Sequence, residues 1–265
     1  MVFYFIELSE KLRLLRIMIT PSLDQRDSMR IYPKGESPVM YQRWEKLLFL
    51  HWQMDPEAIQ STLPSGLYVD THEGKAYVGI VPFYMQGVRP RGFPAVPYLS
   101  NFLECNVRTY VHDERGVPGV WFYSLDANRW IACKIGRGVF QLPYFWAQME
   151  SEADEKIKYS LRRKQAGIDK VSYSYRLGPN LEVSEIGSLE FFLLERYQLY
   201  AYASKKEKII TCRVHHEPYR FCVQEGTEWN SMPCSWNGLS LLSENVVHAC
   251  VADSVSVSVF APKSH

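Results

Sequence analysis

The sequence lacks the features that usually mark a partner of nucleic acid or membrane. Its 30 lysines and arginines against 29 aspartates and glutamates leave a formal charge of +1, so no general electrostatic field attracts a polyanion. No run of about 18 uncharged apolar residues occurs, and no basic segment opens the N-terminus as it does in a signal peptide. We therefore expect a cytoplasmic protein with neither nucleic acid nor membrane as a partner.

Signatures of metal, disulfide and nucleotide chemistry are also missing. The six cysteines form no C-x-x-C pair, which argues against a disulfide framework or a zinc ribbon. No Walker loop, dinucleotide fingerprint or G-x-S-x-G turn is present. His215 and His216 are adjacent, and neighbouring strand residues point to opposite faces, so they are not expected to share an ion. We expect no cofactor and no metal site.

Aromatic residues are abundant instead, at 14% with 17 tyrosines, and such residues favour strands. Strand-like runs occur at residues 67–71, 75–83, 102–111, 120–126, 134–140, 150–164, 171–177, 197–203 and 209–215. The first two runs and the last two are spaced as hairpins, and short helices are indicated after Asp55 and Ser188. The pattern predicts a mainly β fold (β-rich α+β), in which an antiparallel sheet system closes on itself.

The patterned region is expected to form a single domain over residues 40–265. Residues 1–39 show little strand periodicity and contain Pro21, Pro33 and Pro38, so we expect an N-terminal extension there. This extension is either irregular or read from a start codon placed too far upstream. The sequence leaves both a monomer and a homo-oligomer open.

The stretch from residue 104 to 111 combines a polar and an apolar face. Strand geometry puts four polar side chains on one face: Glu104, Asn106, Arg108 and Tyr110. One interpretation is the solvent side of an antiparallel sheet, which is often wet on one face. The alternative is a polar lumen, in which Arg108 offers a planar fork to a carboxylate and Glu104 neutralises it in the empty state.

Several short runs share their order and composition with a known family. They are Gln42-Arg43-Trp44, Phe49-Leu50-His51-Trp52, Glu104-x-Asn106-Val107-Arg108-Thr109-Tyr110, Pro118-Gly119-Val120-Trp121-Phe122, Leu142-Pro143-Tyr144, Leu193-x-Glu195-Arg196-Tyr197-x-Leu199-Tyr200 and His215-His216-x-Pro218. Over residues 40–262 the chain resembles the YqjF-like family of uncharacterised proteins, which is similar to the acetoacetate decarboxylase superfamily. The resemblance implies a closed, cone-shaped antiparallel barrel with a polar cavity, and it favours the lumen interpretation.

The same resemblance argues against the decarboxylase reaction. Acetoacetate decarboxylases carry a Gly-Arg-Glu-x-x-Gly-Phe-Pro-Lys-Lys-x-Ala segment, whose first lysine attacks the ketone as a free amine. In the corresponding residues 136–147, Tyr144 and Phe145 replace the two lysines and Gly138 replaces the glutamate. A tyrosine forms no iminium, and Lys134 lies ten residues earlier, which makes it a poor substitute. Schiff-base decarboxylase activity is therefore not expected.

The candidate ligand-binding residues are Glu104, Asn106, Arg108, Tyr110, Arg137 and Tyr144, with His51, Arg196 and His215 as secondary candidates. Arg137 keeps the position of the superfamily arginine, so it faces either the cavity or solvent. His51 is either a pocket base or a core histidine. Glu195 and Arg196 are interpreted first as a structural ion pair.

Three functions remain open at this point. The first is binding of a small anionic or carbonyl-bearing metabolite in the polar barrel cavity, without Schiff-base chemistry. The second is a lyase or hydrolase acting on a keto acid-like substrate, with Glu104 as general acid or base, Arg108 as carboxylate clamp and Tyr144 as proton donor. The third is a non-catalytic interaction protein.

Overall fold

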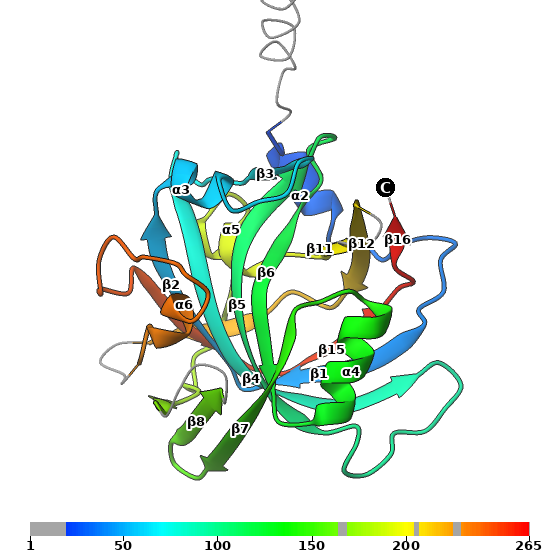
Figure 1. Ribbon diagram of the computed structural model, residues 1–265, viewed down its shortest axis with the longest axis vertical. Coiled ribbons are helices and arrows are strands. Elements are labelled where there is room, and N and C mark those ends of the chain that lie inside the picture. The colour runs from blue at the N-terminus through cyan, green and yellow to red at the C-terminus, as the bar shows by residue number, and fades with distance from the viewer. Residues whose placement is uncertain (1–19, 164–168, 204–206, 225–228, 265) are drawn as a thin grey trace, which may run out of the picture.

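Seven strands form a closed barrel in the computed structural model, which describes residues 20–163, 169–203, 207–224 and 229–264 (Figure 1). Around the barrel they are β1 (Met40–Glu45), β4 (Ala76–Pro90), β5 (Phe102–Asp113), β6 (Pro118–Ala127), β11 (Gln198–Ala203), β12 (Lys208–His215) and β15 (Val255–Val259), which returns to β1. Neighbouring barrel strands are antiparallel except β6 and β11, which are parallel. The expected mainly β, closed antiparallel barrel is confirmed.

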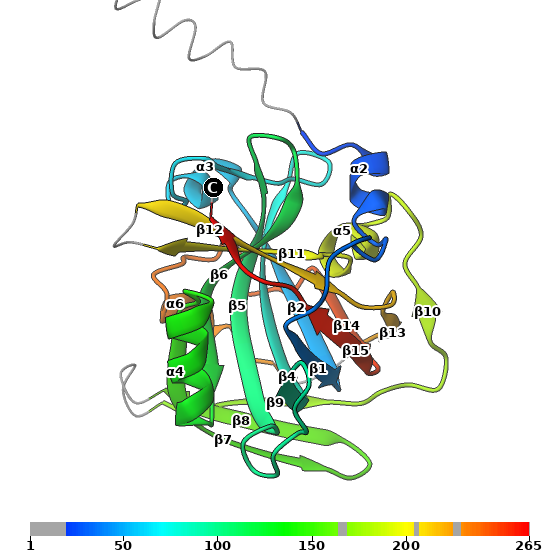
Figure 2. The ribbon, with the colours of Figure 1, turned by 90° about the vertical axis from the view of Figure 1, so that its right-hand side faces the viewer.

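Further strands extend the barrel wall into a second layer (Figure 2). From β4 the sheet continues through β2 (Leu47–Met54), β14 (His248–Ala252), β13 (Arg220–Val223) and β10 (Glu182–Val183). From β6 it continues through β7 (Tyr144–Ala153), β8 (Ile157–Arg163) and β9 (Val171–Tyr175). The short strands β3 (Leu67–Val69) and β16 (Lys263–Ser264) pair with β5 and β12.

The helices are short and lie around the barrel (Figure 1). They are α2 (Leu23–Ser28), α3 (Pro56–Gln60), α4 (Trp130–Val139), α5 (Leu189–Leu194) and α6 (Met232–Ser235). The side chain of Asp55 caps α3 and that of Ser188 caps α5, as their sequence positions predict.

Strand β5 is buried on both faces. Cys105 and Val107 belong to an apolar core outside the barrel wall, which also contains Tyr159 of β8. Phe102 and Tyr110 belong to the core inside the barrel. The solvent-facing interpretation of residues 104–110 is therefore wrong, and their polar side chains lie in the interior.

Three local expectations were wrong. Residues 134–140 belong to helix α4 and its C-cap, and Cys133 and Gly136 of this helix are buried at helical spacing. The run at 150–164 falls on the hairpin β7–β8 rather than on one strand. The run at 67–71 pairs with β5 instead of residues 75–83, because β4 ends its pairing with β5 at Val78 and leaves the rest of β5 to β3.

The described part of the expected extension packs on the domain. Helix α2 begins with a capping box at Ser22, and its Arg26 is buried. Both terminal nitrogens of Arg26 donate to the carboxylate of Asp70, at 2.7 and 2.6 Å. Residues 20–39 thus contribute to the fold, whereas residues 1–19 lie outside the described residues.

Asp70 also accepts a hydrogen bond of 2.6 Å from Arg196, so one buried carboxylate holds two guanidiniums. Replacing Asp70 by asparagine should lower the free energy of unfolding by about 3–5 kcal/mol, because two buried cations lose their counter-charge. Asp27→Asn, which breaks a half-buried pair of 3.4 Å with Arg30 within one helix turn, should cost about 0–1 kcal/mol. Urea unfolding at pH 7 measures both, and equal losses would contradict this assignment.

Candidate functional site

The barrel contains a cavity of about 330 Å³ that opens to solvent at one end. Its walls come from β1, β4, β5, β6, β11 and β12, and α4 closes one side. Val96 and Leu99 of the β4–β5 connection, and Ile131 and Ile135 of α4, line the cavity and are also exposed. The mouth therefore lies between α4 and this connection.

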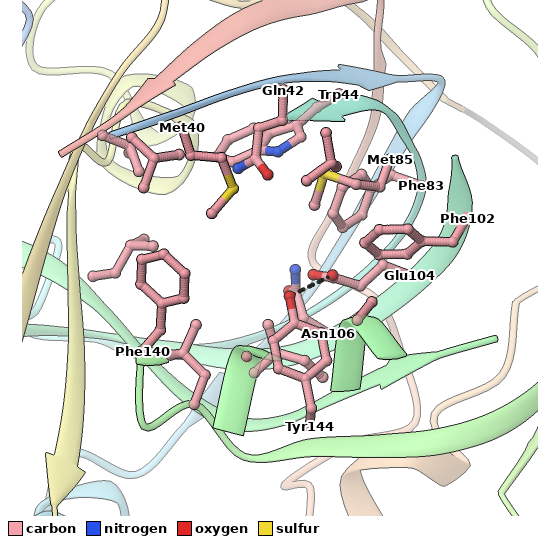
Figure 3. A pocket seen from close by; sticks show the side chains of 18 of the residues that line it. Met40, Gln42, Trp44, Phe83, Met85, Phe102, Glu104, Asn106, Phe140 and Tyr144 are labelled. Atoms are coloured by element: carbon pink, nitrogen blue, oxygen red, sulfur yellow. Dashed lines mark hydrogen bonds between the residues drawn. The ribbon is translucent and has the colours of Figure 1, made fainter. Parts of the chain in front are cut away.

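Glu104 and Tyr144 form a hydrogen-bonded pair in the cavity wall. The Tyr144 hydroxyl donates to Oε2 of Glu104 over 2.8 Å, and Figure 3 shows both side chains with Asn106 beside them and Gln42 on the opposite wall. Burial raises the pKa of Glu104 to about 8, and the hydrogen bond from Tyr144 and the neighbouring Asn106 offset this only in part. Glu104 is therefore mostly a neutral carboxylic acid at pH 7, able to donate a proton.

Gly136 makes room for the Tyr144 ring. A Cβ at Gly136 would lie 2.3 Å from Cδ2 of Tyr144 and 2.4 Å from its Cε2. Only a glycine lets this turn of α4 approach the ring so closely. The helix thus fixes the position from which the hydroxyl reaches Glu104.

Arg108 follows Glu104 by four residues on β5, further along the strand from the β4–β5 connection, and both side chains are buried. Its Nη2 donates to the carbonyl of Leu193 over 3.1 Å and to the Tyr110 hydroxyl over 3.4 Å. Its guanidinium also lies 5.2 Å from the ring centroid of Phe49. Among the described residues, Nε has no hydrogen-bond partner and no carboxylate forms an ion pair with the group.

Arg196 and Tyr219 line the same cavity. Arg196 is held by Asp70 and by the carbonyl of Phe192, and its Nη2 has no partner among the described residues. Burial lowers the pKa of Arg196 to about 10, which leaves it charged at pH 7. The guanidinium groups of Arg108 and Arg196 thus both line the cavity.

A chain of buried side chains stands behind Arg108. The Tyr110 hydroxyl lies 2.6 Å from Nε2 of His51, and Nδ1 of His51 lies 2.9 Å from Nδ1 of His248. Burial lowers the pKa of both histidines, that of His248 to about 4, so both are neutral at pH 7. His51 does not line the cavity. Its position is that of a buried core histidine, which was one of the two interpretations.

The structure brings most of the predicted site together. Glu104, Asn106, Arg108, Tyr144 and the secondary candidate Arg196 line the cavity. Tyr110 lies behind Arg108, as its hydrogen bond shows. Glu104 does not neutralise Arg108, because it is bonded to Tyr144 and mostly protonated.

Arg137 and His215 lie outside the cavity, contrary to their selection as candidates. Arg137 is exposed on α4 and its Nε donates to the Cys133 carbonyl within the same helix. His215 packs against Tyr32. The expected Glu195–Arg196 ion pair is also replaced, because Arg196 bonds to Asp70 and Glu195 accepts a hydrogen bond from Tyr197.

Most of the apolar lining was not among the candidates, and neither were Gln42, Gly136 and Tyr219. Gln42 and Tyr219 lie in or beside family-like runs, but no periodicity singles them out. Gly136 carried a usable signal, since a glycine inside a helix costs about 1 kcal/mol relative to alanine and usually has a packing reason. That signal was hidden because the segment was interpreted as a strand.

The described residues contain no group of three or more histidine, cysteine, aspartate or glutamate side chains placed to hold a metal ion. His216 packs against Tyr197 and Tyr219, and His215 packs against Tyr32. Within the same described ranges, no helix has both the length and the apolar character to cross a membrane.

Comparisons with known proteins identify relatives of this chain. A model of the DUF2071 family, described as "Uncharacterized conserved protein", matches residues 41–256. Uncharacterized protein YqjF of Bacillus subtilis (strain 168) is 36% identical over 182 residues, which are 68% of this chain and 74% of that protein.

Solved structures share the fold at low identity. Enduracididine biosynthesis enzyme MppR complexed with pyruvate has a TM-score of 0.59 and 11% identity, with 87% of this chain and 91% of that chain covered. Acetoacetate decarboxylase from Legionella pneumophila has a TM-score of 0.57 and 11% identity, with 89% and 90% covered. These likenesses show an acetoacetate decarboxylase-like fold.

The raised pKa of Glu104 predicts a pH dependence of stability. The neutral form stabilises the fold fully below the ordinary pKa of 4.5, and this contribution is lost as the pH rises through about 8. Between these values the loss is at most about 4–5 kcal/mol. Glu104→Gln should therefore lose less stability than the wild type between pH 5 and 8.5 in urea unfolding. Glu182→Gln, at an exposed site on β10, should follow the wild type; three equal slopes would refute the prediction.

Proposed function

The chain belongs to the DUF2071 family and has an acetoacetate decarboxylase-like barrel, and we propose that this barrel binds a small metabolite through its carboxylate or a related planar anion. The observation that carries the proposal is Arg108, a buried guanidinium that lines the cavity and has no described carboxylate partner. A buried charge without a counter-charge is costly. A bound anion relieves that cost by forming a charge-assisted interaction with the guanidinium of Arg108.

The electrostatics of the interior support an anion. The charge of Asp70 is shared between Arg26 and Arg196, so it leaves nothing for Arg108. Glu104 is mostly neutral at pH 7, since its pKa is about 8. Burial lowers the pKa of His216 to about 4, so this neighbour adds no charge of its own. The interior keeps a net positive charge that a carboxylate would balance.

The pair of Glu104 and Tyr144 suits a carbonyl or hydroxyl group on the same ligand. A neutral acid in a largely apolar cavity donates a hydrogen bond to a ligand oxygen, and a pKa of about 8 lies close to the working pH of a general acid. This observation favours a second function, acid–base catalysis by a lyase or hydrolase on a keto acid-like substrate. In that reaction Arg108 would hold the carboxylate while Glu104 delivers the proton.

Imine chemistry is not part of the proposal. No lysine among the described residues lines the cavity. Tyr144 occupies the wall, whereas Phe145 contacts Arg163, its ring centroid 4.3 Å from the guanidinium. Lys134 is exposed on α4 and lies over Trp130. The structural neighbour MppR is complexed with pyruvate, which supports an oxo acid as the first ligand to test here.

Titration calorimetry with pyruvate tests the carboxylate site. Arg108→Gln should weaken binding about 10- to 100-fold, because it removes the charge that interacts with the carboxylate. Arg137→Gln removes the same charge from the exposed face of α4 and should leave the affinity unchanged. Thermal unfolding of each variant controls for folding. Equal affinities of Arg108→Gln and wild type would refute the proposed site.

Borohydride trapping tests the absence of imine chemistry. After incubation with acetoacetate and reduction, peptide mass spectrometry should detect no stoichiometric adduct, because no described cavity lysine supplies the amine. An adduct on Lys134, or on any other lysine, would overturn this part of the proposal.

A further inference from the structure

We propose that the ligand carries an apolar tail of about six to ten carbon atoms, so that the substrate class is a medium-chain or aryl-substituted carboxylate. The inference rests on the proposed function, which supplies the carboxylate site at Arg108. It adds the part of the ligand that occupies the rest of the cavity.

The walls between Arg108 and the mouth are mainly apolar. Phe83 and Met85 of β4, Phe122 and Leu125 of β6, and Phe140 face the space that Glu104 and Arg108 share. Figure 3 shows Phe83, Met85, Phe102 and Phe140 around it. Water gains few hydrogen bonds along such a surface, whereas each methylene buried against it contributes favourably to binding.

The polar groups have an order along β5 that suits an amphiphile. Phe102 begins the strand after the connection at the mouth, Glu104 follows, and Arg108, which donates to the Leu193 carbonyl, is furthest along the strand from that connection. Six residues of a strand span about 20 Å. A ligand whose carboxylate binds Arg108 can therefore extend a long way towards solvent. A carbonyl or hydroxyl oxygen close to its carboxylate would lie beside Asn106 and Glu104.

The volume agrees with a ligand larger than pyruvate. A cavity of about 330 Å³ equals roughly eleven times the share of liquid volume that one water takes. Pyruvate alone would leave much of it empty, and an unfilled apolar cavity loses contacts on its walls. A carboxylate with a tail of about eight carbons fills the space.

The apolar lining continues onto the surface around the mouth. Ile131 and Ile135 are 43% and 50% exposed, and Val96 and Leu99 are 49% and 42% exposed, although all four line the cavity. The connection is fixed to α4 by Arg129, whose Nε donates to the Tyr98 carbonyl over 3.0 Å. Exposed apolar patches of this kind mark binding grooves, and this one continues the path of the tail.

A chain-length series on the full chain tests the inference. Titration with butanoate, hexanoate, octanoate and decanoate should tighten binding about fourfold for each added methylene, the fold-change that corresponds to about 0.8 kcal/mol. 1-Octanol, which has the tail without the charge, should bind at least about tenfold more weakly than octanoate. The expected gain should stop once the tail reaches solvent at the mouth.

A matched pair of variants on α4 tests the route of the tail. Ile131→Glu places a carboxylate at the mouth and should weaken octanoate at least about tenfold while leaving butanoate unchanged. Val139→Glu adds the same charge at an exposed position of the same helix that does not line the cavity, and it should leave both affinities unchanged.

The outcomes separate the two proposals. If butanoate and pyruvate bind at Arg108 and affinity does not rise with chain length, the tail is refuted and the carboxylate site stands. If no carboxylate binds at any length, the proposed function fails and the tail with it. If Ile131→Glu and Val139→Glu change the affinity for octanoate equally, the route of the tail is refuted. The route is also refuted if a second copy of the chain covers the mouth, as a dimer in sedimentation would indicate, while octanoate binding is unaffected.

Discussion

The uncompensated charge of Arg108 is the constraint on which the rest of the barrel interior depends. A buried ion normally costs several kcal/mol, and the described contacts of this one are neutral groups: the Leu193 carbonyl, the Tyr110 hydroxyl and the ring of Phe49. Its field also contributes, after burial, to lowering the pKa of His51 and His216. The histidines that could have added charge therefore stay neutral, and no described carboxylate neutralises the charge of Arg108.

That charge also orders the chain of side chains behind it. Arg108 only donates, so the Tyr110 oxygen accepts from it and the Tyr110 proton points to Nε2 of His51. His51 must then carry its proton on Nδ1 and donate to His248, whose own proton is on Nε2 and faces Glu190, 3.9 Å away. The reverse orientation leaves the Tyr110 proton without an acceptor. This direction fixes both tautomers and gives the Tyr110 hydroxyl and both nitrogens of His51 a partner, whereas Nε2 of His248 has no hydrogen-bond partner among the described residues.

The sequence allowed the prediction of features that depend on local periodicity, and it failed where a contact joins distant segments. The polar face of β5 was visible because strand residues alternate, and the family-like runs indicated that this face lines a lumen. The α4 segment was misread as a strand, and Arg137, selected because it keeps the position of the superfamily arginine, is exposed on this helix. Asp70 is 126 residues from Arg196, and nothing local in either segment reveals that pair. Tyr219 lies in a connection, where no period marks its direction.

Tyr144 changes the cavity beyond the loss of an amine. A charged lysine beside Glu104 would favour the carboxylate by its charge and hold the glutamate ionised. A tyrosine donates a neutral hydrogen bond, which offsets burial only in part and leaves the pKa of Glu104 at about 8. With Glu104 neutral, its side chain does not compete with a ligand for Arg108. Tyr144, whose ring fits because Gly136 has no side chain, therefore gives a wall that offers a proton and leaves the guanidinium of Arg108 available to an anion.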